Sequence, residues 1–130
     1  MKQMSKGFTV IEIIFVALIA GFAGVIFFVQ KNNIQTVAND NERKIAINAM
    51  YYSLEEVFFA KNGYYPQNIS ADNLPSVDPK LFKDPSGNEI NTKNSDYTYT
   101  PSNCENNKCK EYQLKTTLEN EADYIKSNKN

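Results

Sequence analysis

The sequence contains no histidine and no tryptophan, and it has only two cysteines. Without histidine, the catalytic sets that pair a nucleophilic serine or cysteine with an imidazole cannot be assembled. Two thiols with no histidine do not match a zinc-binding pattern, and no glycine-rich phosphate-binding loop is present. The composition therefore argues against an enzyme, and it predicts no cofactor and no metal site.

Excess charge of one sign is also lacking, since Lys and Arg number 14 and Asp and Glu number 15. A formal net charge of −1 gives no general attraction to nucleic acid, and nucleic-acid binding stays an open question. The mean hydropathy is −0.50 although the N-terminal third is apolar. The rest of the 130 residues must therefore be polar, with room for one small domain in an aqueous compartment.

Proline is absent before Pro66, and polar side chains are almost absent from Phe8 to Val29. Within that stretch only Thr9 and Glu12 are polar. A helix rises about 1.5 Å per residue, so the stretch is about as long as the ~30 Å hydrocarbon core of a bilayer is thick. It is predicted to span a membrane. A carboxylate in such a helix is costly, which makes Glu12 a candidate functional group that needs a partner.

The motif Lys-Gly-Phe-Thr-Val-Ile-Glu occupies residues 6–12, directly before the apolar stretch. It resembles the class III signal of type IV pilins and type II secretion pseudopilins, with Val10 in place of the commoner leucine. The resemblance implies that a prepilin peptidase cuts between Gly7 and Phe8. Phe8 would then become the N-methylated terminus, and Glu12 would be the carboxylate kept in the mature helix.

The resemblance further implies a structural subunit of a type IV pilus-like filament. Monomers would first be single-pass proteins of the cytoplasmic membrane, with the N-terminus in the cytoplasm, and then join an extracellular or periplasmic filament. The implied partners are other copies of the chain in a helical homopolymer, related pilin subunits, the prepilin peptidase, the inner-membrane assembly platform and, before assembly, the lipid bilayer. Glu12 would pair with the Phe8 amine of a neighbouring subunit, because an unpaired charge in a dry core is costly.

Three alternatives stay open from the sequence. Within the family, the chain could be a pseudopilin of a type II secretion or DNA-uptake machine. Outside it, the chain could be a single-span anchor that carries a binding domain and never polymerises. A secretory signal peptide cleaved after Ala23 is the third, although Glu12 would then lie inside its apolar region. The basic residues Lys2 and Lys6 favour a cytoplasmic N-terminus.

The region after residue 30 changes from uniformly apolar to amphipathic. Apolar residues recur there at helical spacing and form one predicted core-facing stripe: Ile47, Met50, Tyr51, Leu54, Val57 and Phe58. The polar residues between them are predicted to face away: Asn48, Ser53, Glu55 and Glu56. With no proline to interrupt it, one helix is predicted from about Thr9 to Lys61, ended by Gly63 and Pro66.

The remaining residues predict a loop followed by a small sheet. Residues 67–95 are irregular, with a turn at Asp84-Pro85-Ser86-Gly87 and four apolar anchors: Leu74, Val77, Leu81 and Phe82. Residues 97–100 and 111–115 alternate apolar and polar side chains, as half-buried strands do; four side chains should face the helix: Tyr97, Tyr99, Tyr112 and Leu114. Residues 116–121 are predicted to extend the second strand or begin a third, and residues 122–130 to form a loosely held tail.

The predicted fold is α+β: a long N-terminal α-helix, membrane-spanning in its first half, on a small antiparallel β-sheet, as in the pilin lollipop. It divides into a leader at residues 1–7, a transmembrane or filament-core half-helix at 8–30, an amphipathic half-helix at 31–63, and the loop and sheet at 64–130. Asp84, Glu89 and Asp96 fit no calcium-loop spacing, so turn chemistry is the preferred interpretation.

Cys104 and Cys109 lie at the predicted connection between the two strands. An even number of cysteines in an oxidising compartment indicates a disulfide, with two buried free thiols as the alternative. The loop between them is short, so the chain-entropy model gives a bridge worth only about 2 kcal/mol.

Overall fold

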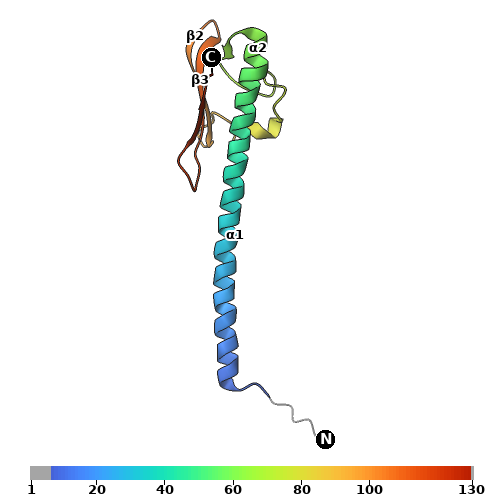
Figure 1. The fold of residues 1–130 in the computed structure, drawn as a ribbon, viewed down its shortest axis with the longest axis vertical. Coiled ribbons are helices and arrows are strands. Elements are labelled where there is room, and N and C mark those ends of the chain that lie inside the picture. Colours follow the sequence, from blue (N-terminus) through green and yellow to red (C-terminus); the bar gives the residue numbers. More distant parts are fainter. Residues whose placement is uncertain (1–6, 130) are drawn as a thin grey trace. The chain divides into compact units, whose positions relative to one another are not determined.

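The computed structural model describes residues 7–129 of the chain. The predictions that involve Lys2, Lys6 and the body of the leader lie outside the described residues. Contacts divide the chain into two compact units after Gln35. The α+β class is confirmed, because one long N-terminal helix packs against a small antiparallel sheet (Figure 1).

The long helical stretch is continuous but not uniform. It consists of α1 (Val10–Tyr52), the π-helix η1 (Ser53–Phe58) and the short α2 (Phe59–Asn62). In the π-helical turn, the amide of Phe59 donates to the carbonyl of Leu54, five residues back. The predicted helix from Thr9 to Lys61 is therefore correct in extent, but the prediction of a single helical repeat throughout is wrong.

Gly63 ends the helical stretch as predicted. Its φ of 75° is left-handed, a conformation that glycine adopts at no steric cost, and its amide donates to the carbonyl of Phe59 at 2.7 Å. The chain then leaves the helix and enters the first strand at Tyr65.

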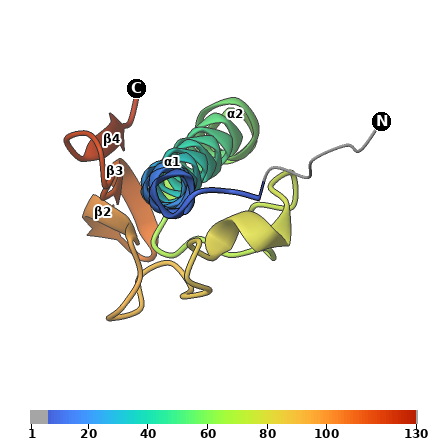
Figure 2. The same cartoon turned by 90° about the horizontal axis from the view of Figure 1, so that it is seen from below.

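The sheet is antiparallel and is built around its third strand. β1 (Tyr65–Pro66), β2 (Tyr97–Glu105) and β4 (Tyr124–Ser127) all pair with β3 (Lys108–Thr116). β2 takes one edge of β3, while β1 and β4 share the other edge, opposite residues 108–109 and 113–116 respectively. Figure 2 shows β3 between β2 and β4. The two predicted strands are confirmed as parts of β2 and β3.

The prediction for the C-terminal residues is wrong. Residues 122–130 were expected to be a loose tail, yet Tyr124–Ser127 form β4 on the edge of β3. Residues 116–121 neither extend β3 beyond Thr116 nor begin the next strand. Tyr124 and Ile125 are the apolar residues of this strand, but Ile125 is exposed, so the backbone pairing with the edge of β3 is the main attachment of the segment.

The core lies between the second part of the helical stretch, the loop and the sheet. Its buried members include most of the predicted residues: Ile47, Met50, Leu54, Leu74, Val77, Phe82, Tyr97, Tyr99, Tyr112 and Leu114. Three predictions on the helix are wrong, because Val57 is exposed whereas Ser53 and Glu55 are buried. All three lie in η1, where the wider π-helical turn rotates side chains away from the positions that an α-helical repeat assigns.

Candidate membrane and assembly segment

The candidate processing motif lies at the beginning of α1. Gly7, Phe8 and Thr9 immediately precede the first helical residue, Val10. The backbone N–H of Thr9 donates to Oε2 of Glu12 at 3.0 Å, and the Thr9 hydroxyl lies 3.2 Å from the same oxygen. In return, the backbone N–H of Glu12 lies 3.4 Å from the Thr9 hydroxyl oxygen.

This reciprocal arrangement is a capping box, in which the N-cap residue and the residue three positions later satisfy each other's backbone N–H groups. The signature Thr-x-x-Glu is visible in the sequence at residues 9–12, so the sequence alone contains the signal for this cap. A carboxylate in the first turn also complements the positive end of the helix dipole. Glu12 thus has a role within a single chain, in addition to any role between chains.

The apolar part of α1 is exposed in the part of the chain that the structure describes. Phe22 is 71% exposed and Leu18 57% exposed, and none of the most apolar 18-residue window is buried. By length and composition, this helix is suited to crossing a membrane, and it lies near the N-terminus. Large exposed apolar surfaces of this kind are typical of sites that contact lipid or other proteins.

The second unit contains a buried ion-pair cluster that the sequence analysis missed. The guanidinium of Arg43 donates to Oδ1 of Asp40 at 2.8 Å and to Oδ2 of Asp96 at 3.0 Å. Glu119 lies at its edge, with a carboxylate oxygen 3.6 Å from Arg43. Arg43 is 5% exposed and Asp40 4% exposed. A polar pair three residues apart on a helix is more often a surface feature, so no signal in the sequence distinguished it.

Two buried carboxylates have pKa values below their usual range. Burial alone would raise the pKa of Asp40, but hydrogen bonds from the amides of Glu119 and Asn120 and from Arg43 outweigh it. Burial is likewise outweighed at Asp84, whose pKa is lowered by the backbone amides of residues 96, 88 and 86. Their ionised forms therefore stabilise the fold at neutral pH, and that contribution is lost as the pH falls through the lowered pKa.

Glu55 is the centre of a second buried polar cluster. Its carboxylate accepts hydrogen bonds from the hydroxyl of Tyr65 at 2.9 Å, from the hydroxyl of Tyr112 at 2.7 Å and from the backbone N–H of Lys129 at 3.0 Å. Burial, with Glu55 beside it, raises the pKa of the Tyr112 hydroxyl far above its usual value. The π-helical turn directs Glu55 into this position, and the sequence pattern gave the opposite prediction.

The predicted disulfide between Cys104 and Cys109 is present. It closes the hairpin between β2 and β3, where Asn106 and Asn107 have φ values of 51° and 66°. Two successive central residues with positive φ are typical of the type I′ turn that matches the twist of a two-residue hairpin. The bridge therefore lies directly behind a turn whose local sequence already favours the hairpin.

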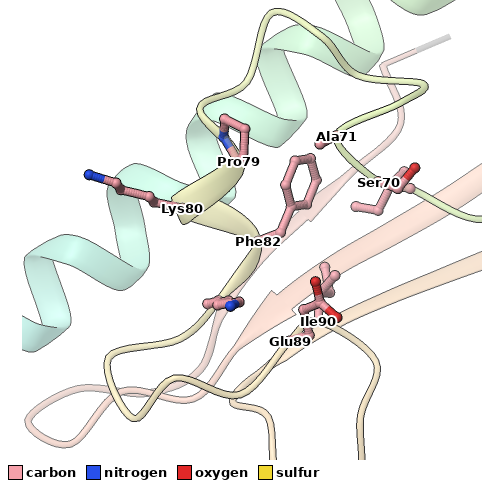
Figure 3. A pocket seen from close by; sticks show the side chains of 9 residues that line it. Ser70, Ala71, Pro79, Lys80, Phe82, Glu89 and Ile90 are labelled. Atoms are coloured by element: carbon pink, nitrogen blue, oxygen red, sulfur yellow. The ribbon is translucent and has the colours of Figure 1, made fainter.

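A hollow of about 450 Å³ lies among the loop residues, lined in part by Ile69, Phe82 and Ile90. Figure 3 shows the ring of Phe82 between Pro79 and Ala71, with Lys80 extending away from it. Over residues 7–129, no group of three or more His, Cys, Asp or Glu side chains is placed to hold a metal ion. The carboxylate of Asp84 accepts hydrogen bonds from the backbone N–H groups of Ser86 and Asn88 within its turn, and from that of Asp96 farther along the chain.

The comparisons with known proteins identify no relative. No family model matches the chain, and neither a curated protein nor a solved structure matches it. A function can therefore be inferred only from the sequence motif at residues 6–12 and from the physical properties of the two units.

Proposed function

We propose that the chain is a structural subunit of a type IV pilus-like filament. Residues 1–7 are the leader, cleavage between Gly7 and Phe8 frees the mature protein, and N-methyl-Phe8 begins it. The monomer waits in the cytoplasmic membrane, anchored by the apolar helix, until the assembly platform adds it to the filament. The one observation that carries the proposal is Glu12, the single charged side chain in the exposed apolar stretch from Phe8 to Val29, four residues beyond the proposed new terminus.

The exposed apolar helix supports the proposal because its apolar side chains need to be covered. Its side chains can be covered by lipid in the monomer and by the helices of other copies in a filament. In the filament, the carboxylate of Glu12 pairs with the charged amine of Phe8 on a neighbouring subunit. Because only one stagger of two helices brings these groups together, the pair also selects the register of assembly.

The capping box favours a second candidate function, a single-span anchor that does not polymerise. In that case Glu12 serves only to begin the helix, through Thr9. The two functions differ in whether the charge of residue 12 matters. Glutamine can replace glutamate in a capping box, since it also accepts a hydrogen bond from the N-cap amide.

The test therefore compares Glu12→Gln with Thr9→Val. Glu12→Gln keeps the capping box but removes the charge, so the protein should insert normally while filament assembly drops sharply. Thr9→Val removes the hydroxyl that accepts from Glu12 but leaves the charge, so assembly should be affected less. Sedimented filaments are quantified against membrane-inserted monomer. Normal polymerisation of Glu12→Gln subunits on their own would exclude the pairing mechanism.

Processing supplies an independent check. Gly7→Val places a bulky side chain at the scissile bond, so the precursor should stay uncut and filaments should be absent. Mass spectrometry of the unmodified mature protein should show N-methyl-Phe8 as its first residue. A mature protein that begins at Gly24 would instead demonstrate signal-peptide cleavage, and a functional uncut Gly7→Val protein would support the anchor.

A further inference from the structure

The last part of the second unit, residues 117–129, is attached differently from the rest of the sheet, and we call it the C-terminal strap. None of its residues belongs to the buried class, although all of them are described. Tyr124 packs partly against the core, while Ile125 is 47% exposed. Burial of apolar side chains, which holds β2 and β3, therefore contributes little to holding the strap.

Two carboxylates from the helical stretch fasten the strap near its two ends. Asp40 accepts hydrogen bonds from the backbone N–H groups of Glu119 and Asn120, at 3.0 and 3.1 Å. Glu55 accepts one from the backbone N–H of Lys129 at 3.0 Å. Both carboxylates are buried, at 4% and 6% exposed, so water does not replace these bonds easily.

The spacing of the two attachments fits a strap that runs along the helix. Asp40 and Glu55 are separated by roughly 20 Å at helical rise, and the residues from Asn120 to Lys129 can reach up to about 30 Å when extended. Between the attachments, β4 pairs with residues 113–116 of β3. Beyond β4, Asn128 continues the pairing, since it exchanges hydrogen bonds with the backbone N–H and C=O of Tyr112.

We propose that the C-terminal strap is a conformational device that opens as a unit while the helix, β1, β2 and β3 stay folded, and that the carboxylates of Asp40 and Glu55 control its opening. The other contacts of the strap are its backbone pairing with β3, the partly buried side chain of Tyr124, and exposed ion pairs such as those from Lys44 to Glu121 and from Lys115 to Asp123. Opening leaves the edge of β3 that β4 covers without backbone partners, and an unpaired edge can accept another strand. The inference does not depend on whether the chain forms filaments.

Isosteric amides test the role of the two carboxylates. Glu55→Gln and Asp40→Asn keep the shape of each side chain but turn one acceptor oxygen into a donor that faces other donors. The matched controls are Glu56→Gln, which removes only the exposed ion pair to Lys129, and Glu42→Gln on the exposed face of α1. Hydrogen–deuterium exchange is followed by mass spectrometry on the full-length protein in detergent micelles.

Exchange of peptides within residues 117–129 should accelerate by about tenfold or more in Glu55→Gln and Asp40→Asn, because each loses a hydrogen bond to a charged group. Exchange within β2 should still require a larger opening free energy than exchange within the strap, and the two controls should resemble the unmodified protein. Equal opening free energies for the strap and β2 would overturn the proposal, because the strap would then open only with the whole domain. Unchanged strap exchange in both variants would overturn it as well.

A measurement on the unmodified protein covers the case in which the variants fail to fold. Exchange is recorded at increasing urea concentration below the unfolding transition, where partial openings are detected in order of their free energy. The strap should lose protection at lower urea than β2. If both lose protection together at every concentration, the strap is not a separate unit and the proposal is wrong.

Discussion

Leu18 and Leu54 belong to the same helical stretch, yet Leu18 is 57% exposed and Leu54 is fully buried. Around Leu18 the neighbouring side chains are also apolar and exposed, whereas Leu54 packs among the core residues of the loop and sheet. The first unit therefore depends on its surroundings for stability, while the second supplies its own core. One helical stretch can lie in two environments because its side chains are apolar on all sides in the first part, whereas in the second part apolar side chains are concentrated on the face that packs against the core.

The two units also differ in how they accommodate charged side chains. In the apolar stretch from residue 8 to residue 29, the charge of Glu12 lies in the first turn, where the capping box and the helix dipole accommodate it. In the second unit, Asp40, Arg43 and Glu55 are buried and carry several hydrogen bonds each. Burying a charge is unfavourable unless hydrogen-bonding or charged partners surround it. These groups can therefore be accommodated only when the second unit has brought their partners together.

The leucine pair gives the most direct test of this comparison. Leu54→Ala should lower the free energy of unfolding of the second unit by about 2–5 kcal/mol, because a cavity forms in the core. Leu18→Ala should change it by no more than about 0.5 kcal/mol. Urea unfolding in detergent, followed by tyrosine fluorescence, measures both. An equal effect of the two changes would mean that the units are not independent.

Arg43→Ala tests the buried ion pairs. The change leaves Asp40 buried with its amide donors but without a cation, and a loss of about 3 kcal/mol in the free energy of unfolding is expected. Lys44→Ala is the neighbouring control, since its ion pair with Glu121 is exposed, and it should have a much smaller effect. A loss at Arg43 no greater than that at Lys44 would show that the buried cluster contributes specificity rather than stability.

Removal of the disulfide should have a moderate effect. Cys104→Ser with Cys109→Ser should lower stability by up to about 2 kcal/mol, because the bridge closes a short loop and the type I′ turn already favours the hairpin. The helix and sheet, and filament assembly, should survive. Circular dichroism during thermal unfolding measures the change, and a double variant that is unfolded at room temperature would contradict it.

Tyr97→Phe is expected to have the smallest effect, and in the opposite direction. The Tyr97 hydroxyl is buried and has no hydrogen-bond partner among residues 7–129. Its removal should raise the free energy of unfolding by about 1 kcal/mol, since a buried hydroxyl without a partner is unfavourable. Tyr99→Phe is the matched control: its hydroxyl donates to the carbonyl of Pro66, so the same change should be destabilising. A loss of stability in Tyr97→Phe would indicate a partner such as a bound water molecule.

The sequence was sufficient for the features that depend on regular patterns. The apolar helix, the end of the helical stretch at Gly63, the two longer strands and the disulfide could all be predicted, because each follows from composition, spacing or turn chemistry. The prediction failed at Ser53 and Glu55, where a π-helical turn departs from the α-helical repeat used to assign faces. It also failed at β4, since nothing in a strand of 4 residues indicates which strand edge is free to pair with it.

The π-helical turn has a consequence for insertions and deletions. Its hydrogen bond spans five residues rather than four, so η1 contains one residue more than an α-helix needs to cover the same turn. A one-codon deletion between residues 53 and 58 would leave a regular α-helix and an intact reading frame. Side chains after the deletion would keep their directions relative to those before it, because the deleted residue is the extra one that the wider turn accommodates. The segment can therefore lose one residue without a change in the faces of the residues that follow, but the deletion would remove the wider turn that directs Glu55 toward Tyr65 and Tyr112.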